Sequence, residues 1–279
     1  MGVNISLSEI SNNLKKHSSD TQWYQDMKGK LRLEIEKATN VNQTKVNLEG
    51  IGLIALPIYS MGNITSIDLF GLDEMILFSF YKQRKQRGLA LDLGANIGLH
   101  SIVLSKLGYR VLAIEPDPMH IKEIKKNLRI NHVESVQVIE KAVSSRTGSA
   151  EFIRILGNTT GSHLAGSLGK QPYGEIYKFQ VETVAIYELL SSHPDTTLVK
   201  MDVEGFEAEL ICSLESQSFV HVDFLLEVGS QESARRIYEY LNDRGVHACA
   251  QKIGWEKVSK LEEMPISYKE GSLLIPRQG

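Results

Sequence analysis

The sequence predicts an α/β fold with a doubly wound, mostly parallel, seven-stranded sheet, preceded by a helical and extended N-terminal segment. Two observations predict it. From residue 89 onward, short apolar runs alternate with amphipathic stretches, which is the pattern of parallel strands joined by crossover helices. Acidic residues also follow several of these apolar runs, and ligands of such sheets bind beyond the carboxyl ends of the strands.

The elements of the sheet can be placed from these local patterns. We expect the main strands at Leu89–Leu93, Arg110–Ile114, Ser135–Val143, Thr197–Val203 and Val222–Val228. Helices are expected at Ile97–Leu107, Pro118–Asn131, Phe206–Leu214 and Glu232–Arg244. Two extra extended pieces, Gly148–Leu156 and Lys178–Val184, flank a polar loop at 157–174. A closing antiparallel pair is expected at Val246–Lys252 and Ser272–Pro276.

The chain is expected to divide into an N-terminal extension, residues 1–66, and a ligand-binding domain, residues 67–279. In the extension we expect a helix at Gln22–Ala38 and an extended segment or hairpin at Lys45–Tyr59. A second helical stretch follows within Ile67–Lys85. The extension could cap the mouth of the site or form the contact of a homodimer.

The composition limits the class of protein. Apolar residues make up 42%, charged residues 23%, and the formal net charge is −3, so nucleic acid is not the expected partner. The longest apolar stretch, Ile51–Tyr59, is too short to span a bilayer, so no stable membrane insertion is expected. Cys212 and Cys249 form no C-x-x-C pair, which fits a reducing, cytoplasmic compartment.

Residues 90–98 read Ala-Leu-Asp-Leu-Gly-Ala-Asn-Ile-Gly and predict a buried strand, a glycine turn and a helix. Glycine allows close approach of the backbone to a ligand, and the start of a helix offers unpaired N–H groups. The next strand ends at Glu115, whose carboxylate can bind both hydroxyls of a ribose. The pattern therefore indicates an adenosine-containing cofactor.

The glycine spacing favours one cofactor class over another. The dinucleotide fingerprint G-x-G-x-x-G fails, because its second and third glycines would fall on Asn96 and Leu99. The turn instead reads D-x-G-x-x-x-G, and Asp92 would repel a pyrophosphate but suits a ligand carrying an ammonium and a sulfonium. This resembles the first motif of class I methyltransferases, which bind S-adenosylmethionine. The alternatives are a nicotinamide-dependent oxidoreductase and a non-catalytic nucleoside-binding protein.

A second constellation follows in residues 198–207, Leu-Val-Lys-Met-Asp-Val-Glu-Gly-Phe-Glu. Strand alternation puts Lys200, Asp202 and Glu204 on one face. Charges on a buried strand are costly unless they are paired or used. They form either an ion pair that shapes the loop or a group that orients the cofactor and moves a proton.

Together these motifs resemble the FkbM-type S-adenosylmethionine-dependent methyltransferases, over roughly residues 67–276. The matching pieces are Asp92–Gly98, Glu115-Pro116, Ala142-Val143, Gly161-Ser162, Lys200–Gly205 with Glu207, Leu226-Glu227 and Leu273–Pro276. The resemblance implies a Rossmann-like class I methyltransferase fold and S-adenosylmethionine as the cofactor. It also implies O-methylation of a hydroxyl on a sugar, a glycan or a secondary metabolite.

The resemblance also implies roles for individual residues. Glu115 would bind the ribose, and the other cofactor contacts would come from Asp92, Gly94, Ala95, Asn96, Gly98, Ala142, Val143 and Asp202. We favour Glu204 as the catalytic base and Glu227 as the second candidate, with Asp202 and Lys200 assisting. Candidate acceptor contacts are His100, Ser162 and His163. Asp202 and Glu204 could hold Mg²⁺, but without a third ligand no metal is predicted.

Overall fold

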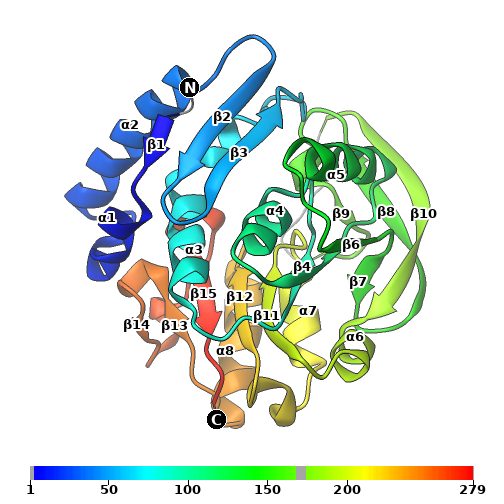
Figure 1. Ribbon diagram of the computed structural model, residues 1–279. Coiled ribbons are helices and arrows are strands. Elements are labelled where there is room, and N and C mark those ends of the chain that lie inside the picture. The colour runs from blue at the N-terminus through cyan, green and yellow to red at the C-terminus, as the bar shows by residue number, and fades with distance from the viewer. Residues whose placement is uncertain (1–2, 168–173, 279) are drawn as a thin grey trace.

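The computed structural model describes residues 3–167 and 174–278, and a twisted central sheet runs through its middle (Figure 1). Within these residues the sheet has eight strands in the order β14-β13-β15-β12-β11-β4-β5-β6. The five strands from β12 to β6 run parallel. They are β4 (Leu89–Leu93), β5 (Arg110–Ile114), β6 (Val136–Ile139), β11 (Thr196–Met201) and β12 (Asp223–Glu227). The predicted parallel core of the sheet is therefore confirmed.

Three antiparallel strands complete this sheet at one side: β15 (Ser272–Ile275), β13 (Cys249–Ala250) and β14 (Glu256–Lys257). The prediction of seven strands is therefore wrong by one for this sheet. The predicted strand Val246–Lys252 is also too long, because a 3₁₀ turn at Gln251–Ile253 ends the pairing.

The parallel core is covered by helices on both faces, as the doubly wound prediction requires (Figure 1). Along β4, Ala90 packs into a core shared with α3 (Leu72–Gln83), α4 (Leu99–Lys106) and α5 (Pro118–Ile130). Its neighbour Leu91 points the other way, into a core shared with α6 (Ile186–Ser192), α7 (Glu207–Cys212) and α8 (Gln231–Asp243). Because successive strand residues face opposite sides, strands buried on both faces read as continuous apolar runs.

The prediction of one strand over Ser135–Val143 is wrong. The chain forms β6, turns where the N–H of Lys141 bonds to the carbonyl of Ile139 (3.0 Å), and continues as β7 (Ala142–Ser144). Strand β7 joins a separate four-stranded sheet of order β7-β10-β8-β9. Its other members are β8 (Gly148–Ile155), β9 (His163–Leu164) and β10 (Ile176–Ala185). The extra extended pieces predicted on either side of the polar loop are thus the long antiparallel pair β8 and β10.

The N-terminal segment forms its own three-stranded sheet, β1-β2-β3, with the predicted helix and hairpin both present. Its elements are β1 (Val3–Ile5), α1 (Leu7–Ser11), α2 (Gln22–Lys37), β2 (Gln43–Leu48) and β3 (Gly52–Pro57). The side chain of Asn131, just after α5, bonds to both the N–H and the carbonyl of Ala55 in β3 (2.9 and 2.7 Å). Leu7 and Ile54 also share one core with Ile102 of α4. The division at residue 66 stays a prediction.

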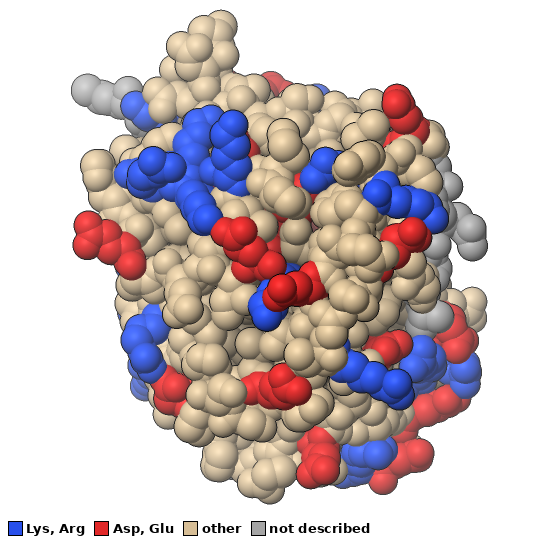
Figure 2. Space-filling model, turned by 90° about the vertical axis from the view of Figure 1, so that its right-hand side faces the viewer, with Lys and Arg blue, Asp and Glu red and all other residues tan. Residues whose placement is uncertain are grey.

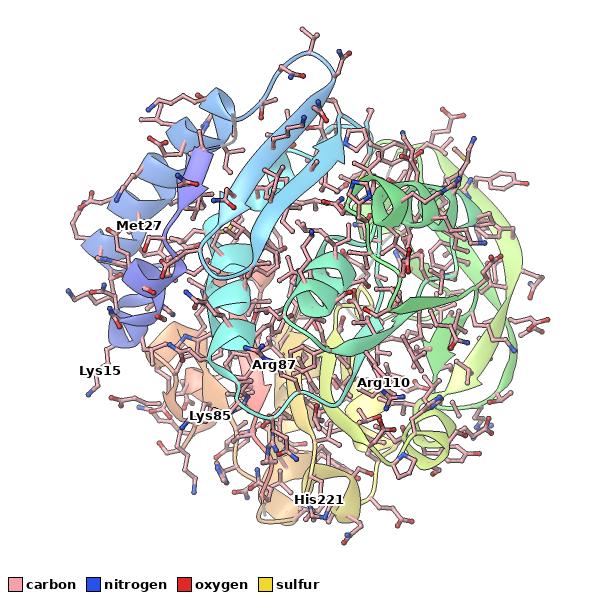
Figure 3. All side chains as sticks on the ribbon, viewed as in Figure 1. Lys15, Met27, Lys85, Arg87, Arg110 and His221 are labelled. Atoms are coloured by element: carbon pink, nitrogen blue, oxygen red, sulfur yellow. The ribbon has the colours of Figure 1, made fainter. Side chains whose placement is uncertain are left out.

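The N-terminal and C-terminal ends of the parallel strands carry different residues. Arg87 precedes β4 and Arg110 begins β5, so both mark the edge where these strands start (Figure 3). At the opposite edge the strands end at Leu93, Ile114 and Glu227, and the polar turns follow. Among the helices of the described residues, none combines the length and the apolar composition of a membrane span.

Candidate active site

A cavity of about 650 Å³ lies at the carboxyl ends of β4, β5, β11 and β12. This volume is typical of pockets for small molecules and cofactors. Residues 64–74 and 152–164 supply further walls. The predicted site residues that line it are Gly94, Asn96, Glu115, Ala142, Val143, Ser162, His163, Asp202, Glu204 and Glu227. Those that do not are Asp92, Ala95, Gly98, His100 and Lys200.

Asp92 lies beneath the glycine turn and not in the cavity wall. Its side chain is fully buried, and Oδ2 accepts a hydrogen bond from Ser101 Oγ (2.6 Å). Lys200 Nζ lies 3.7 Å from Asp92 Oδ1 and 3.4 Å from Asp202 Oδ2. Burial disfavours the charged lysine, yet the charges of Asp202, Asp92 and Glu74 together raise the pKa of Lys200 above its ordinary value. Lys200 therefore stays charged and lies between the buried carboxylate of Asp92 and the carboxylate of Asp202, which lines the cavity.

The two glycines of the first motif have left-handed backbone, and packing also requires the first of them, Gly94. Gly94 has a φ of 75°, and a Cβ at this position would collide with the carbonyl oxygen of Asp202. Gly98, with a φ of 86°, is the N-cap residue of α4 and lies against Ile124 of α5. Glycine is thus needed where the turn after β4 meets the end of β11.

Glu115, at the end of β5, organises the turn that lines the cavity. Its carboxylate accepts hydrogen bonds from the N–H groups of Asn96 (2.8 Å) and Asp117 (3.0 Å). His120 Nδ1 lies 3.6 Å from Glu115 Oε1. Burial opposes protonation of this imidazole, but the hydrogen bond and charge of Glu115, with the charge of Asp117, raise the pKa of His120. Glu115 is therefore held in one orientation at the cavity wall.

The second constellation forms a tight turn between β11 and α7. The carboxylate of Glu207 accepts hydrogen bonds from the N–H groups of Val203 and Gly205, both at 3.0 Å. Glu204 has a left-handed backbone with a φ of 53° and lines the cavity beside Asp202. Left-handed backbone is costly for a residue other than glycine, and such strain concentrates at functional sites. Glu207 thus holds the turn that presents Asp202 and Glu204.

Carboxylates from several elements meet in this part of the cavity. Burial, together with the charges of Asp202, Glu204, Glu74 and Glu207, raises the pKa of Glu227 well above its ordinary value. Glu74 comes from the first turn of α3, which the sequence analysis did not connect with the site. The cavity therefore concentrates negative charge at the ends of β11 and β12.

His100 lies behind Glu74. Its Nε2 atom is 2.6 Å from Glu74 Oε2, and its Nδ1 atom is 3.0 Å from the hydroxyl of Tyr81. The sequence analysis named His100 as a candidate acceptor contact, but its side chain does not line the cavity and instead bonds to Glu74 and Tyr81. His100 reaches the cavity only through Glu74.

Residues 158–163 contribute polar groups to the cavity wall. Ser162 Oγ accepts the N–H of Ile155 (3.1 Å), and His163 Nδ1 donates to the carbonyl of Gly161 (2.9 Å). The hydroxyl of Thr159 lies 3.1 Å from His120 Nε2. Residues 168–173 of the polar loop at 157–174 lie outside the described residues.

Glu74 and His120 are site residues that the sequence analysis missed. Both occupy the first turn of a helix, and His120 follows the Glu115-Pro116 motif by only a few residues, which was the one available signal. As for metals, the described residues contain no group of three or more His, Cys, Asp or Glu side chains arranged to hold an ion.

A parallel α/β sheet with a carboxylate after β5 and a glycine turn after β4 is the arrangement typical of Rossmann-like nucleotide-binding folds. The family described as "Methyltransferase FkbM domain" matches residues 92–247, which is more than half of the chain. The chain belongs to this methyltransferase family. Membership decides against the nicotinamide-dependent oxidoreductase that the sequence left as an alternative.

Similar solved structures are distant. A precorrin-6y C5,15-methyltransferase from Geobacter metallireducens is 16% identical with a TM-score of 0.42, over 64% of this chain and 74% of that one. A SAM-dependent methyltransferase from Agrobacterium tumefaciens is 9% identical with a TM-score of 0.44, over 86% and 71%. The N-terminal domain of human METTL16 in complex with SAH is 15% identical with a TM-score of 0.37, over 73% and 66%. Among curated proteins, none matches this chain by sequence.

Proposed function

We propose that this protein transfers a methyl group from S-adenosylmethionine to a hydroxyl of a sugar, a glycan or a secondary metabolite. One observation carries the proposal: Glu115 and the carboxylates Asp202, Glu204 and Glu227 line a single cavity. Glu115 suits a ribose, and the other three suit cationic groups and proton transfer. Family membership supports the reaction class.

The residues present fit this cofactor. The Oε2 atom of Glu115, which accepts from the N–H of Asn96, retains a lone pair for a ribose hydroxyl, and Ala142 and Val143 offer an apolar border for adenine. Asn96 Oδ1 is buried and has no hydrogen-bond partner among the described residues, so it can accept from a ligand. When bound, the cofactor supplies an electrophilic methyl group attached to a sulfonium.

The chain's own residues would position the acceptor and remove its proton. Holding two reactants in line can supply roughly 7–11 kcal/mol of the barrier reduction. A base that accepts the hydroxyl proton adds about 10²–10⁴-fold in rate. Glu204 is the proposed base because its strained turn presents it to the cavity beside Asp202. Glu227 is the second candidate, since its raised pKa makes its ionised form a stronger base.

The acceptor is proposed to be a small molecule or a glycan. Thr159, Thr160 and Ser162 line one wall with hydroxyl groups, which are suited to hydrogen bonding with a polyhydroxylated ligand. On the molecular face in Figure 2, basic and acidic side chains are interspersed apart from one basic group near the upper left. Such mixed charge supports a small acceptor over a nucleic acid. A cytoplasmic location and a homodimer stay predictions.

Two measurements test the proposal. Calorimetric titration with S-adenosylhomocysteine and with NADH should show binding of the first alone. Incubation with S-adenosylmethionine labelled in its methyl group should transfer label to hydroxylated molecules of a cell extract or a panel of sugars. Binding without any transfer would favour the non-catalytic alternative, and preference for NADH would contradict the proposal.

A further inference from the structure

Glu74 reaches the cavity from outside the parallel sheet. It lies in the first turn of α3 and lines the cavity together with Asp202 and Glu227. It also lines a smaller adjoining space of about 40 Å³ together with Lys200. The side chain of Glu74 keeps 31% of its surface exposed although it lies deep in the molecule, because it faces these spaces. A ligand in the cavity can therefore contact it.

The orientation of Glu74 is set by a hydrogen-bonded chain. A carboxylate can only accept, so His100 Nε2 donates to Glu74 Oε2 (2.6 Å), and His100 Nδ1 lies within hydrogen-bond distance of the Tyr81 hydroxyl (3.0 Å). The ring of Phe78 packs edge-on against His100, with centroids 5.1 Å apart. Glu74, Phe78 and Tyr81 are spaced to share one face of α3. The carboxylate is thus held in place from behind.

The charge of Glu74 is maintained despite its depth. Burial alone would raise its pKa, but the hydrogen bond and charge of His100 and the charge of Lys200 lower it below the ordinary value. The hydrogen bond from His100 goes to Oε2, and the second oxygen, Oε1, makes none within the described part of the chain. An ionised carboxylate with an available oxygen therefore faces the cavity.

The remaining charges of the cavity leave this carboxylate without a local cation at its open side. No lysine or arginine is among the described residues that line the cavity. Lys200 does not line this cavity, and its ammonium group already lies between Asp92 and Asp202. The neighbouring carboxylate of Asp73 also lines the cavity, but it accepts hydrogen bonds from the side chains of Tyr24 (2.7 Å) and Gln251 (2.7 Å). His100 and Lys200 stabilise the ionised Glu74 from the protein side, and its cavity-facing side is open to a positive group of a ligand.

We propose that Glu74 binds a positively charged group of the S-adenosylmethionine cofactor, its ammonium or its sulfonium, and that His100 and Tyr81 act as positioning residues for Glu74. The assignment rests on the proposed function. It adds a binding residue from α3 to those at the strand ends, and it gives the Tyr81–His100–Glu74 chain a role in cofactor affinity.

The test compares three ligands by calorimetry on wild type and Glu74→Gln. S-adenosylmethionine carries both cations, S-adenosylhomocysteine carries only the ammonium, and adenosine carries neither. Glu256→Gln is the matched control, because Glu256 pairs with Lys15 at the edge of the molecule (Figure 3). Glu74→Gln should weaken S-adenosylmethionine binding roughly tenfold or more and leave adenosine binding unchanged. The control should bind all three ligands as wild type does.

Comparison of the three ligands shows whether Glu74 binds the ammonium or the sulfonium. Equal weakening for S-adenosylmethionine and S-adenosylhomocysteine assigns the ammonium, and weakening for S-adenosylmethionine alone assigns the sulfonium. Unchanged affinity for S-adenosylmethionine, or an equal loss for adenosine, overturns the role of Glu74. If wild-type protein binds none of the three ligands, the proposed function itself is overturned, and the assignment with it.

The positioning role of His100 is tested by a double-mutant cycle. His100→Leu removes the donor to Glu74, whereas His100→Gln keeps an N–H donor and should recover part of the affinity for S-adenosylmethionine. In a Glu74→Gln background, His100→Leu should cause no further loss, because the two residues act through one contact. Additive losses would show that His100 acts independently of Glu74 and would overturn its positioning role.

Discussion

The backbone N–H of Asn96 donates a 2.8 Å hydrogen bond to Oε2 of Glu115, so the turn after β4 and the end of β5 hold each other in place. The other oxygen of Glu115 accepts from the N–H of Asp117, at the start of α5. One carboxylate thereby joins the two segments that border the proposed cofactor site. Its removal should affect both binding and local stability.

Glu115→Ala is expected to weaken S-adenosylhomocysteine binding about 10- to 100-fold, because hydrogen bonds to a charged group are worth roughly 1.5–3 kcal/mol. Thermal unfolding should also occur at a lower temperature, since the N–H groups of Asn96 and Asp117 lose their acceptor. Calorimetry and circular dichroism measure the two effects. A folded variant with wild-type affinity would show that Glu115 does not bind the ribose.

Glu204→Gln is expected to reduce methyl transfer by about 10²–10⁴-fold while S-adenosylhomocysteine affinity stays close to wild type, because a base acts in the chemical step. The assay uses the acceptor identified by label transfer. Glu227→Gln is the matched comparison, since it removes a second carboxylate from the same cavity. Normal turnover in Glu204→Gln with loss in Glu227→Gln would assign the base to Glu227.

Stability should depend on pH through Glu207. Burial, and then the charge of Asp202, raise the pKa of Glu207 from its usual 4.5 to about 7, although hydrogen bonds from Gly205 and Val203 oppose the rise. The folded state therefore binds more protons than the unfolded state between these values. The contribution is fully present below about pH 4.5 and is lost as pH rises through 7, on the order of 3 kcal/mol in total.

Glu207→Gln should remove this dependence, because the amide does not titrate and its oxygen can still accept from Gly205. Urea unfolding at pH 4.5, 6 and 8 measures the difference in unfolding free energy between variant and wild type. That difference should grow in favour of the variant as pH rises. A constant difference across this range would contradict the raised pKa of Glu207.

Gly94→Ala is expected to destabilise the protein more than Gly108→Ala does. Both positions have positive φ, 75° and 94°, so both variants pay about 1–2 kcal/mol for backbone strain. Only at position 94 would the new Cβ strike another group, the carbonyl oxygen of Asp202, whereas position 108 is open. Overpacking typically costs a further ~1–3 kcal/mol. Equal losses in urea unfolding would show that the turn can shift away from β11.

Much of the sheet could be predicted because its strands are buried on both faces. Leu91 and Ala113 belong to apolar runs bounded by turns, and these runs match the observed strands within a few residues. The strand expected over Ser135–Val143 could not be resolved, since the apolar pattern continues through the turn at Lys141 where the chain changes sheets. Sequence periodicity does not show which partner strand a segment pairs with.

The sequence predicted those site residues whose position follows from a local pattern. Glu115, Asp202 and Glu227 directly follow or end parallel strands, and parallel strands end at the same edge, so their meeting follows from the pattern alone. Glu74 belongs to a helix that precedes the sheet, and no local pattern indicates that its first turn faces the same cavity.

By itself, the sequence determined the parallel core, the position of the ligand-binding edge and the carboxylates that stand along it, because hydrophobic periodicity and strand ends are local properties. The tertiary structure decided which charged groups face the cavity and which support it from below. Asp92 and Lys200 lie on adjacent paired strands and compensate each other in the interior, whereas Glu74 reaches the cavity from α3. These assignments depend on the packing of elements distant in sequence, since burial and charge pairing arise only when the chain has folded.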